Sequence, residues 1–354
     1  MARFGGRYYR CAELMFVLFG ILGLALLMVV HEMGHHFAAR AYGMRVIKFS
    51  IGFGPALWRH QPKGSSTVYQ VALIPFLAYV QIAGMNPFEE VDPKDESSYA
   101  NASLPARTVT IFAGPLANYL FASVLFLGAF VIGGKLVPTL KVNVMPGSAA
   151  EAGKMLDGDR ILSVDGHAVD SWNDMRTIVQ RSGGKTVRVD VDRNGQKHTL
   201  SVTPKIQGDD RHGQLGVETI GRHVPMSLGE ALQRSVVEPA ALASSLVVGL
   251  ARLVTGKEKA QLTGPLGIVG ETGKAARRGL DVFLGFLGAL STYLGVFNLL
   301  PFPALDGGRL MFLGYEAVAR RRPNAKLEAQ IHAVGLAMLL ALIAVVSVFD
   351  IRGH

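Results

Sequence analysis

The stretch LMFVLFGILGLALLMVVHEMGHH, residues 14–36, decides the fold of this chain, because an apolar run leads directly into a cluster of ionisable residues. The run Leu14 to Val30 is close to the roughly 20 residues that a helix needs to cross hydrocarbon. His31 and His35 are four residues apart and therefore project from one face of a helix. The stretch predicts a transmembrane helix that carries a metal site at its end.

The composition extends this prediction to the rest of the chain. Of its 354 residues 49% are hydrophobic and 18% charged, and the mean hydropathy is +0.30, which excludes an ordinary soluble protein of this length. Similar runs cover Thr108 to Gly134, Val282 to Leu305 and Ala333 to Phe349, so we expect about four transmembrane helices. Ala240 to Val254 is shorter, contains Arg252 and follows Pro239, which predicts an in-plane or packed helix.

The spacing His31-Glu32-Met33-Gly34-His35 is typical of zinc hydrolases. Both histidines can bind one zinc ion through a ring nitrogen, and Glu32 stands beside them to take a proton from the attacking water. Interfacial histidines that cap a membrane helix are the alternative. Ionisable groups are costly in a segment continuous with hydrocarbon, which favours the functional interpretation. We expect His36, about 100° round the helix from His35, to face headgroups or to form a local hydrogen bond.

A zinc ion with two histidine ligands needs a third protein ligand, which is commonly a carboxylate. The segment NLLPFPALDGG, residues 298–308, supplies Asp306. Its prolines and glycines break the third apolar run, and broken backbone at membrane depth is tolerated only where it is packed in protein or lines a cavity. The sequence therefore predicts that Asp306 meets His31 and His35.

Charged residues suggest a topology. The cluster Arg320, Arg321, Arg322 and Lys326 lies between the last two runs and predicts a cytoplasmic loop there. Counting back makes residues 41–105 cytoplasmic and residues 136–278 external, and it brings His31 and Asp306 to one depth. The basic residues Arg3, Arg7 and Arg10 conflict with this orientation. With Cys11 as its one cysteine, the chain has no disulfide framework.

Two segments have the composition of β structure. Val46 to Trp58 and Thr67 to Ile82 predict a membrane-associated β-hairpin, with Pro75 favouring an edge position. Further on, a helix near residues 173–181 precedes strands at 186–193 and 198–203, which Asn194-Gly195 joins as a hairpin turn. The string GSAAEAGKMLDGDRILSVDG, residues 147–166, resembles a circularly permuted bacterial PDZ domain. A small α+β module without a ligand is the alternative.

Together, HEMGH, GPLAN (residues 114–118), TGPLGIVG (residues 263–270) and NLLPFPALDGGR resemble the site-2 proteases of the bacterial regulator-of-sigma-E protease group. The resemblance implies an intramembrane zinc metalloendopeptidase in which His31, His35 and Asp306 hold zinc and Glu32 is the catalytic base. It also implies that Asn298, Pro301 and Pro303 contact substrate, and that the hairpin between Thr67 and Val80, through Tyr69, Val71 and Leu73, receives substrate as an added strand. The chain departs from the family in having room for one PDZ domain and in having Leu77-Ala78 where the family has Gly-Gly.

The expected fold is an α-helical polytopic membrane protein with an inserted α+β PDZ-like domain. Its expected segments are a first span at 1–42, the hairpin and cytoplasmic loop at 43–105, a second span at 106–135, the PDZ-like domain at 136–206, a linker with an amphipathic helix at 207–279, a third span at 280–318, and a basic loop with the fourth span at 319–354.

By the same resemblance, the substrates are single-pass membrane proteins such as an anti-sigma factor, and the location is the bacterial inner membrane with the PDZ-like domain outside the cytoplasm. The PDZ-like domain could bind a C-terminal peptide, and no nucleic-acid partner is expected. Two alternatives stay open: a zinc protease that acts on soluble or unfolded chains at the membrane surface, and a non-enzymatic PDZ scaffold or metal transporter.

Overall fold

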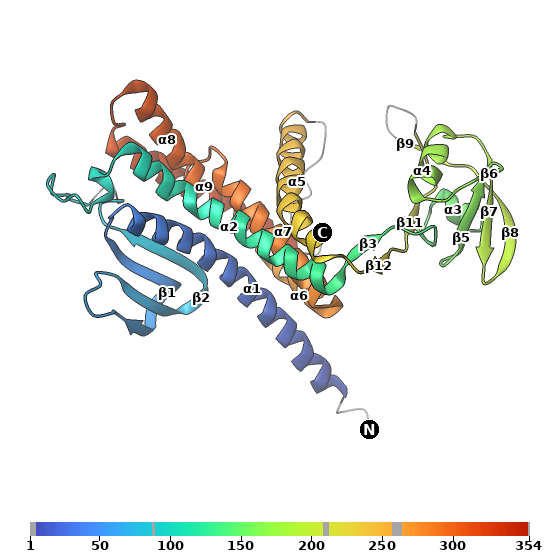
Figure 1. Ribbon diagram of the computed structural model, residues 1–354, viewed down its shortest axis with the longest axis horizontal. Helices are drawn as coiled ribbons and strands as arrows, with labels where there is room; N and C mark the ends of the chain where they lie inside the picture. The colour runs from blue at the N-terminus through green and yellow to red at the C-terminus, as the bar shows by residue number, and fades with distance from the viewer. Residues whose placement is uncertain (1–4, 87–88, 208–211, 257–263, 353–354) are drawn as a thin grey trace. The chain divides into compact units, whose positions relative to one another are not determined.

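The computed structural model describes residues 5–86, 89–207, 212–256 and 264–352. The chain forms two compact units: residues 133–226, and the remainder of the chain. Figure 1 shows that helices dominate the larger unit, with one curled β-sheet beside the end of its first helix. The helices are α1 (Gly5–Ala41), α2 (Leu104–Gly133), α5 (Leu228–Val254), α6 (Pro265–Arg278), α7 (Leu280–Leu299), α8 (Asp306–Ala319) and α9 (Ala325–Arg352).

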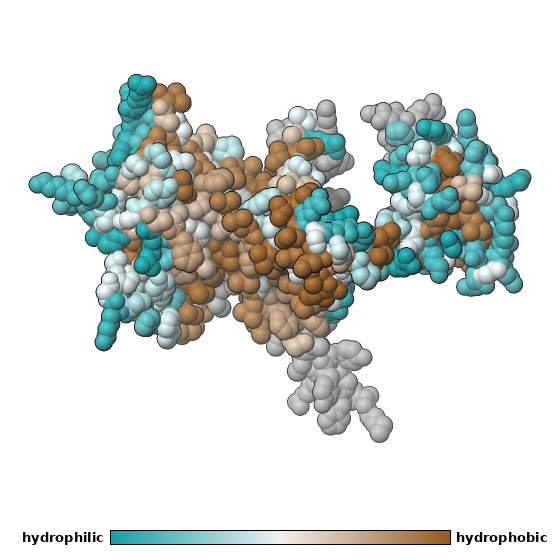
Figure 2. Space-filling model, in the orientation of Figure 1, coloured by the Kyte–Doolittle hydropathy of each residue, from teal (hydrophilic) through white to brown (hydrophobic). Residues whose placement is uncertain are grey.

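Five helices of the described residues are long and apolar enough to cross a membrane, namely α1, α2, α5, α7 and α9. Figure 2 shows apolar surface over the middle of this helical unit and polar surface at the end that carries α8. The sequence predicted four such helices. The fifth is α5, which continues through Pro239 as one helix instead of beginning after it.

The turn before Pro239 is held by a contact with α2. Proline removes one backbone donor from the helix and displaces the preceding turn. The Tyr119 hydroxyl of α2 donates to the Val236 carbonyl in that turn at 3.1 Å. Beyond this point α5 diverges from α2 (Figure 1), and its apolar side chains Val247 and Val248 are more than half exposed.

The predicted third span is two helices. Helix α7 ends at Leu299 and α8 begins at Asp306, with Pro301 and Pro303 in the connecting loop. Gly307 and Gly308 follow at the start of α8, where a Cβ at Gly307 would lie 2.1 Å from the Leu300 carbonyl oxygen. The broken backbone therefore has the sequence position that was predicted, and Asp306 occupies the first turn of a new helix.

The helices α1, α2 and α7 pack through a small apolar core of Leu27, Leu125 and Leu287. Gly34 of α1 lies against Ala113 of α2, so these two helices are antiparallel. Gly23 of α1 lies against Leu287 of α7, and His31 lies against Asp306, so α1 and α7 run in the same direction. This arrangement brings the ends of α1 and α7 together.

The strands β1 (Val46–His60) and β2 (Val68–Ile82) confirm the predicted hairpin, but it is curled into a four-segment sheet. Residues 46–51 pair with 68–71 on one side and with 78–82 on the other, and residues 56–60 pair with 69–72. The strand β1 turns back at Gly52, whose φ of +94° suits glycine. The two open edges are therefore segments 56–60 and 78–82.

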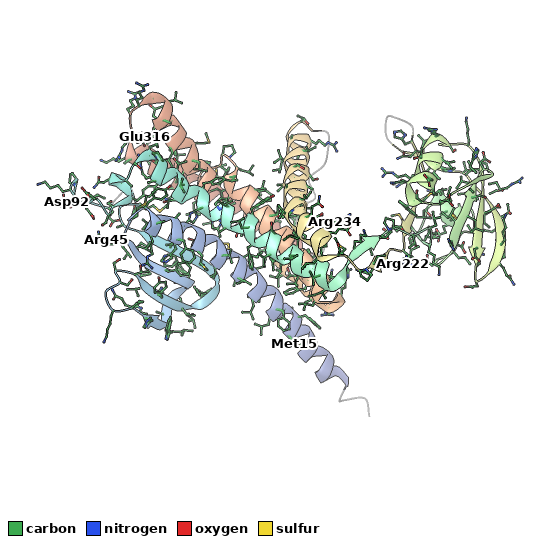
Figure 3. The ribbon with its side chains drawn as sticks, in the orientation of Figure 1. Met15, Arg45, Asp92, Arg222, Arg234 and Glu316 are labelled. Carbon is green, nitrogen blue, oxygen red and sulfur yellow. The ribbon has the colours of Figure 1, made fainter. Side chains whose placement is uncertain are left out.

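The end of the larger unit that carries Arg45, Asp92 and Glu316 is polar, and Met15 lies at the opposite end (Figure 3). A bidentate ion pair joins Arg107 of α2 to Glu316 of α8 there, with N–O distances of 2.9 and 2.5 Å. Both side chains are largely buried. Breaking this pair would leave the largely buried Glu316 carboxylate with the more exposed Arg322, 3.6 Å away, as its described ion-pair partner.

We expect Arg107→Met to destabilise the helical unit by about 3–5 kcal/mol, because Glu316 loses its buried partner. Thermal unfolding in detergent measures the change, and Arg40→Met, at an exposed position, is the control. The double variant Arg107→Met, Glu316→Leu should regain most of the loss. A single variant as stable as the parent would show that the pair contributes nothing.

The unit 133–226 has a four-stranded antiparallel sheet in the order β6-β5-β7-β8. Its members are β5 (Arg160–Val164), β6 (His167–Ala168), β7 (Val187–Arg193) and β8 (Gln196–Val202), and the helices are α3 (Ala149–Ala152) and α4 (Trp172–Arg181). Short strand pairs join β3 (Lys135–Val137) to β12 (Arg222–Val224), β4 (Val142–Val144) to β11 (Val217–Thr219), and β9 (Lys205–Gln207) to β10 (His212–Gln214).

The predicted Asn194-Gly195 turn is present between β7 and β8, with φ of 55° and 84°. Positive φ at both central residues is the geometry that this pair favours in a two-residue hairpin. The unit extends beyond the expected boundary at residue 206, because β11 and β12 return to pair with β4 and β3. Pairing of distant segments is not visible in local sequence patterns.

Asp190 of β7 gives this unit a stability that depends on pH. Its carboxylate pairs with Lys197 at 2.9 Å and accepts hydrogen bonds from Thr199 and Ser163, which together lower its pKa to about 2. An Asp in an unfolded chain has a pKa of about 3.9. The stabilising contribution is therefore complete above about pH 4 and is lost as the pH falls towards 2.

We expect Asp190→Asn to lower the stability of the unit at pH 7 and to differ progressively less from the parent below pH 4. Trp172 fluorescence in a Trp58→Phe background measures unfolding of this unit in the full chain. Asp165→Asn, at an exposed turn position, is the control. A stability difference that stays constant from pH 7 to pH 2 would contradict the assignment.

Candidate metal centre

Three side-chain atoms from α1 and α8 meet at one point. His31 Nε2 lies 3.1 Å from Asp306 Oδ2, His35 Nε2 lies 3.2 Å from the same oxygen, and the two ring nitrogens are 3.3 Å apart. Both histidines are about 5% exposed. The structure thus brings together the three residues that the sequence nominated, of which His31 and Asp306 are the farthest apart in the chain.

The triangle fits a zinc ion. Ligand bonds of about 2.0–2.1 Å at tetrahedral angles place donor atoms about 3.3 Å apart. Two nitrogens and one carboxylate oxygen are also the donor set of many catalytic zinc sites, with a fourth position left for water. Asp306 Oδ2 is buried and has no hydrogen-bond partner of normal geometry among the described residues, which a metal would satisfy.

Helix α2 orients both imidazole rings. His35 Nδ1 lies 2.8 Å from the Thr110 carbonyl, which accepts its proton and leaves Nε2 free to bind metal. The Asn118 amide nitrogen lies 3.3 Å from His31 Nδ1, while Asn118 Oδ1 has no partner among the described residues. Turning this amide by 180° places Oδ1 against His31 Nδ1–H and satisfies both groups.

Gly114 lets α2 approach the ligands. A Cβ at this position would lie 2.3 Å from His35 Nε2 and 2.9 Å from His31 Cε1. Gly114 belongs to the GPLAN motif and lies directly against the two histidine rings. The backbone of α2 therefore closes one side of the centre.

Glu32 contacts the β-sheet. Its Oε2 accepts a hydrogen bond of 3.0 Å from the Val80 backbone N–H, and Val80 belongs to the open edge segment 78–82. The carboxylate is only one residue from His31 in the chain. This backbone contact carries no side-chain signal in the sequence, so it could not be predicted there.

The residues expected to contact substrate lie around the loop and the sheet. Asn298 Nδ2 donates to the Leu294 carbonyl at 3.0 Å, and Pro301 and Pro303 line a cavity of about 790 Å³ beside α8 and α9. Tyr69 and Val71 lie in the segment that is paired on both sides, so their side chains are available but their backbone groups are not. Leu73 is 57% exposed, at the bend of β2.

His36 is buried and is not part of the triangle. The Tyr69 hydroxyl lies 3.2 Å from its Nε2, and the ring of Phe49 packs against it at 5.4 Å. Of the two expectations for His36, a local hydrogen bond is confirmed. The residue ties α1 to the sheet.

The sequence profile of peptidase family M50 matches residues 19–342. Zinc metalloprotease RasP of Geobacillus kaustophilus is 28% identical over 92% of this chain and 95% of its own length, and RasP of Shouchella clausii is 30% identical over 92% and 96%. A Clostridium perfringens relative is 31% identical over 95% of this chain and 98% of its own length. The PDZ domain of an SdrC-like protein from Listeria monocytogenes is 20% identical over 24% of this chain and 86% of its own, with a TM-score of 0.21.

The family match spans most of the chain, including the helices that carry His31, His35 and Asp306. Its relatives are zinc metalloproteases, in agreement with the donor set at the centre. The five apolar helices agree with a multi-pass membrane protein. The chain therefore belongs to peptidase family M50, the site-2 protease family, and is a zinc metalloprotease.

Proposed function

We propose that this protein is an intramembrane endopeptidase in which His31, His35 and Asp306 hold the zinc ion and Glu32 is the catalytic base. The meeting of the three ligand atoms beside Glu32, at the end of an apolar helix, supports this assignment most directly. Zinc, when bound, supplies a Lewis acid that polarises a carbonyl and makes water a nucleophile near neutral pH.

The side chains around the centre have distinct tasks in hydrolysis. Glu32 takes a proton from the attacking water while the oxygen of this water bonds to the carbonyl carbon of the peptide. Glu32 then gives the proton to the leaving nitrogen as the C–N bond breaks. Thr110 and Asn118 hold the imidazoles in the orientation that directs Nε2 to the metal. Gly114 leaves room for both rings.

The open edge of the sheet gives a reason for substrate to reach Glu32. A transmembrane helix has every carbonyl hydrogen-bonded, so it must unwind before its peptide bonds are attacked. Segment 78–82 offers backbone groups to an unwound chain by strand addition, apart from the Val80 N–H, which donates to Glu32. Tyr69, Val71 and Leu73 contribute side chains to the same sheet, and Asn298, Pro301 and Pro303 flank the Asp306 loop.

A cysteine crosslinking experiment tests this edge, since the chain has a single cysteine to remove. In a Cys11→Ala, Glu32→Gln background, Gln81→Cys should form disulfides with cysteines placed near the cleavage site of a bound substrate. Arg59→Cys, equally exposed on the opposite edge of the sheet, is the matched control and should not. Equal crosslinking at both edges would exclude strand addition at 78–82.

The packing supports four crossings. Helix α2 is antiparallel to α1 while α7 is parallel to it, which requires an odd number of crossings between α1 and α7, and α2 alone supplies one. Helix α6 lies against the N-terminal half of α1, with a Cβ at Gly20 3.0 Å from the Val269 carbonyl, so the chain returns after α5 to the side where α2 ended. Helix α5 then enters the membrane without crossing it, and the unit 133–226 lies outside the cytoplasm.

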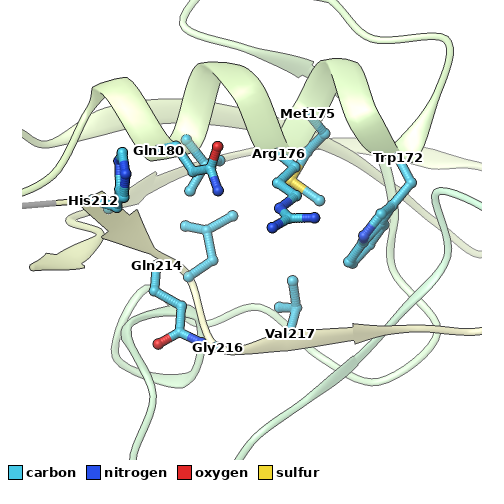
Figure 4. A pocket seen from close by; sticks show the side chains of 11 residues that line it. Trp172, Met175, Arg176, Gln180, His212, Gln214, Gly216 and Val217 are labelled. Carbon is cyan, nitrogen blue, oxygen red and sulfur yellow. The ribbon is translucent and has the colours of Figure 1, made fainter. Parts of the chain in front are cut away.

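The unit 133–226 has a groove suited to an extended peptide. A cavity of about 500 Å³ lies between α4 and the segment 212–217. Trp172, Arg176 and Gln180 line it on the helix side (Figure 4). A groove between a helix and a strand edge is the site at which PDZ domains take a C-terminal peptide. This supports the PDZ-like assignment and a docking role for substrates.

Single-pass inner-membrane proteins, such as an anti-sigma factor, are the proposed substrates. Quantifying membrane-embedded peptides that accumulate in cells carrying Glu32→Gln identifies them. Accumulated fragments that contain a transmembrane segment support the proposal. Accumulation of soluble chains alone would instead assign the protein to hydrolysis at the membrane surface.

A further inference from the structure

The loop that carries Asp306 has a strained backbone. Ala304, two residues before Asp306, has a φ of 78°, in the left-handed region that residues with a Cβ seldom adopt. Such a conformation persists only where the surroundings hold it. The position of the Asp306 carboxylate depends on this turn, because α8 begins immediately after it.

Helix α9 holds the strained turn at two adjacent points. His332 Nδ1 accepts a hydrogen bond of 3.0 Å from the Ala304 backbone N–H. One turn later, Gly335 approaches the loop so closely that a Cβ there would lie 2.3 Å from Pro303 Cβ. These two residues and Ala329 form the inward face of a helix whose other side chains in this stretch are largely exposed.

The bond to Ala304 is specific to one form of the imidazole. Because Nδ1 accepts, the ring proton must reside on Nε2. Nε2 is buried and has no hydrogen-bond partner among the described residues, so the Ala304 bond is the ring's one described polar contact. Phe312 of α8 packs beside the ring with centroids 5.5 Å apart, which fixes its orientation.

From these contacts we propose that His332 is a positioning residue for the metal centre. It acts through the backbone: its Nδ1 keeps Ala304 in the left-handed turn, and the turn places the Asp306 carboxylate against His31 and His35. Helix α9, which contributes no ligand to the triangle, thereby sets the zinc affinity of the site. The inference depends on the proposed role of Asp306 as a ligand.

Zinc competition against a chelator, with the full-length protein in detergent, tests the proposal. His332→Leu should weaken zinc binding by about 10-fold, the lower end of the effect of losing an outer-shell partner of a metal ligand. His332→Asn keeps an acceptor at the position of Nδ1 and should bind zinc nearly as the parent does. In His332→Gln the amide oxygen lies one bond farther from the backbone than in His332→Asn, so it misses the position of Nδ1. This variant should bind zinc as weakly as His332→Leu does.

Two further variants separate the possible failures. Gln330→Leu makes a similar polar-to-apolar change on an exposed face of α9 and should leave zinc affinity unchanged. Asp306→Ala should lose zinc; if it retains zinc, the proposed ligand set fails. If Asp306→Ala loses zinc while His332→Leu keeps the zinc affinity of the parent, only the positioning role of His332 is overturned. Equal zinc affinities of His332→Asn and His332→Gln would overturn it as well.

Discussion

Glu32→Gln should reduce cleavage of a membrane substrate by about 10²–10⁴-fold, the usual contribution of a general base. The amide keeps the size of the carboxylate and can still accept the Val80 hydrogen bond, but it cannot take a proton from water. The zinc content should be unchanged, because the ligand triangle consists of His31, His35 and Asp306. Single-turnover cleavage in detergent or liposomes measures the rate, and metal analysis measures the zinc.

Glu271→Gln is a suitable control for this variant, because Glu271 is an exposed residue of α6 that pairs with Lys274 in the same helix. It should cleave at the parental rate. Full activity of Glu32→Gln would remove Glu32 from the mechanism. Loss of zinc along with activity would give Glu32 a role in the metal site instead.

Asp306→Ala should lose both zinc and activity. The substitution removes one of three donors and leaves two histidines that a bound zinc ion would hold weakly, since a catalytic zinc site normally has three protein ligands. The deficit should appear as zinc stoichiometry well below one in the purified protein, and excess zinc should restore little activity. Zinc equal to the parent would remove Asp306 from the ligand set.

Two glycines of α2, one beside the two histidines and one remote from them, provide a matched test of the same geometry. Gly114→Ala places a methyl group 2.3 Å from His35 Nε2 and should also lower zinc content, although it changes no ligand. Gly128→Ala, on the same helix, meets only Leu284 at 3.1 Å and should retain zinc. Equal zinc content in the two variants would show that α2 adapts to the added methyl group.

The grouping of His31, His35 and Asp306 was predictable because the chemistry of these residues resides in side chains. The spacing of His31 and His35 fixes one helix face, and the prolines and glycines around Asp306 mark a broken helix. Ionisable residues next to hydrocarbon are conspicuous in a sequence. All three donors therefore lie together as expected.

The supporting contacts were not predictable because they belong to the backbone or depend on distant packing. The Thr110 carbonyl and the Val80 N–H leave no mark in the sequence. His332 is a single histidine in an apolar run, and nothing in its neighbours connects it with Ala304. Only the parallel course of α1 and α7 and the return of α9 bring these groups to the centre.

The fold also has features that could be predicted from the sequence and features that could not. Apolar length predicted α1, α2, α7 and α9, and the Asn194-Gly195 pair predicted a turn that is present. The continuation of α5 through Pro239 was missed, because a proline reads as a helix boundary unless a tertiary partner such as Tyr119 stabilises the turn before it. The sequence predicted a simple hairpin where the structure has a curled sheet. The alternation of apolar and polar residues does not show that one segment pairs on both sides.

The close approach of α2 at Gly114 has a consequence for inhibitor design. Because the helix backbone occupies the space beside His35 Nε2, a chelating group cannot reach the metal from that direction. Glu32 and the open sheet edge 78–82 lie on another side of the two histidines. A selective inhibitor of this enzyme should therefore be an extended, strand-like backbone with its zinc-binding group placed opposite Val80, and a compact chelator without such a backbone should bind weakly.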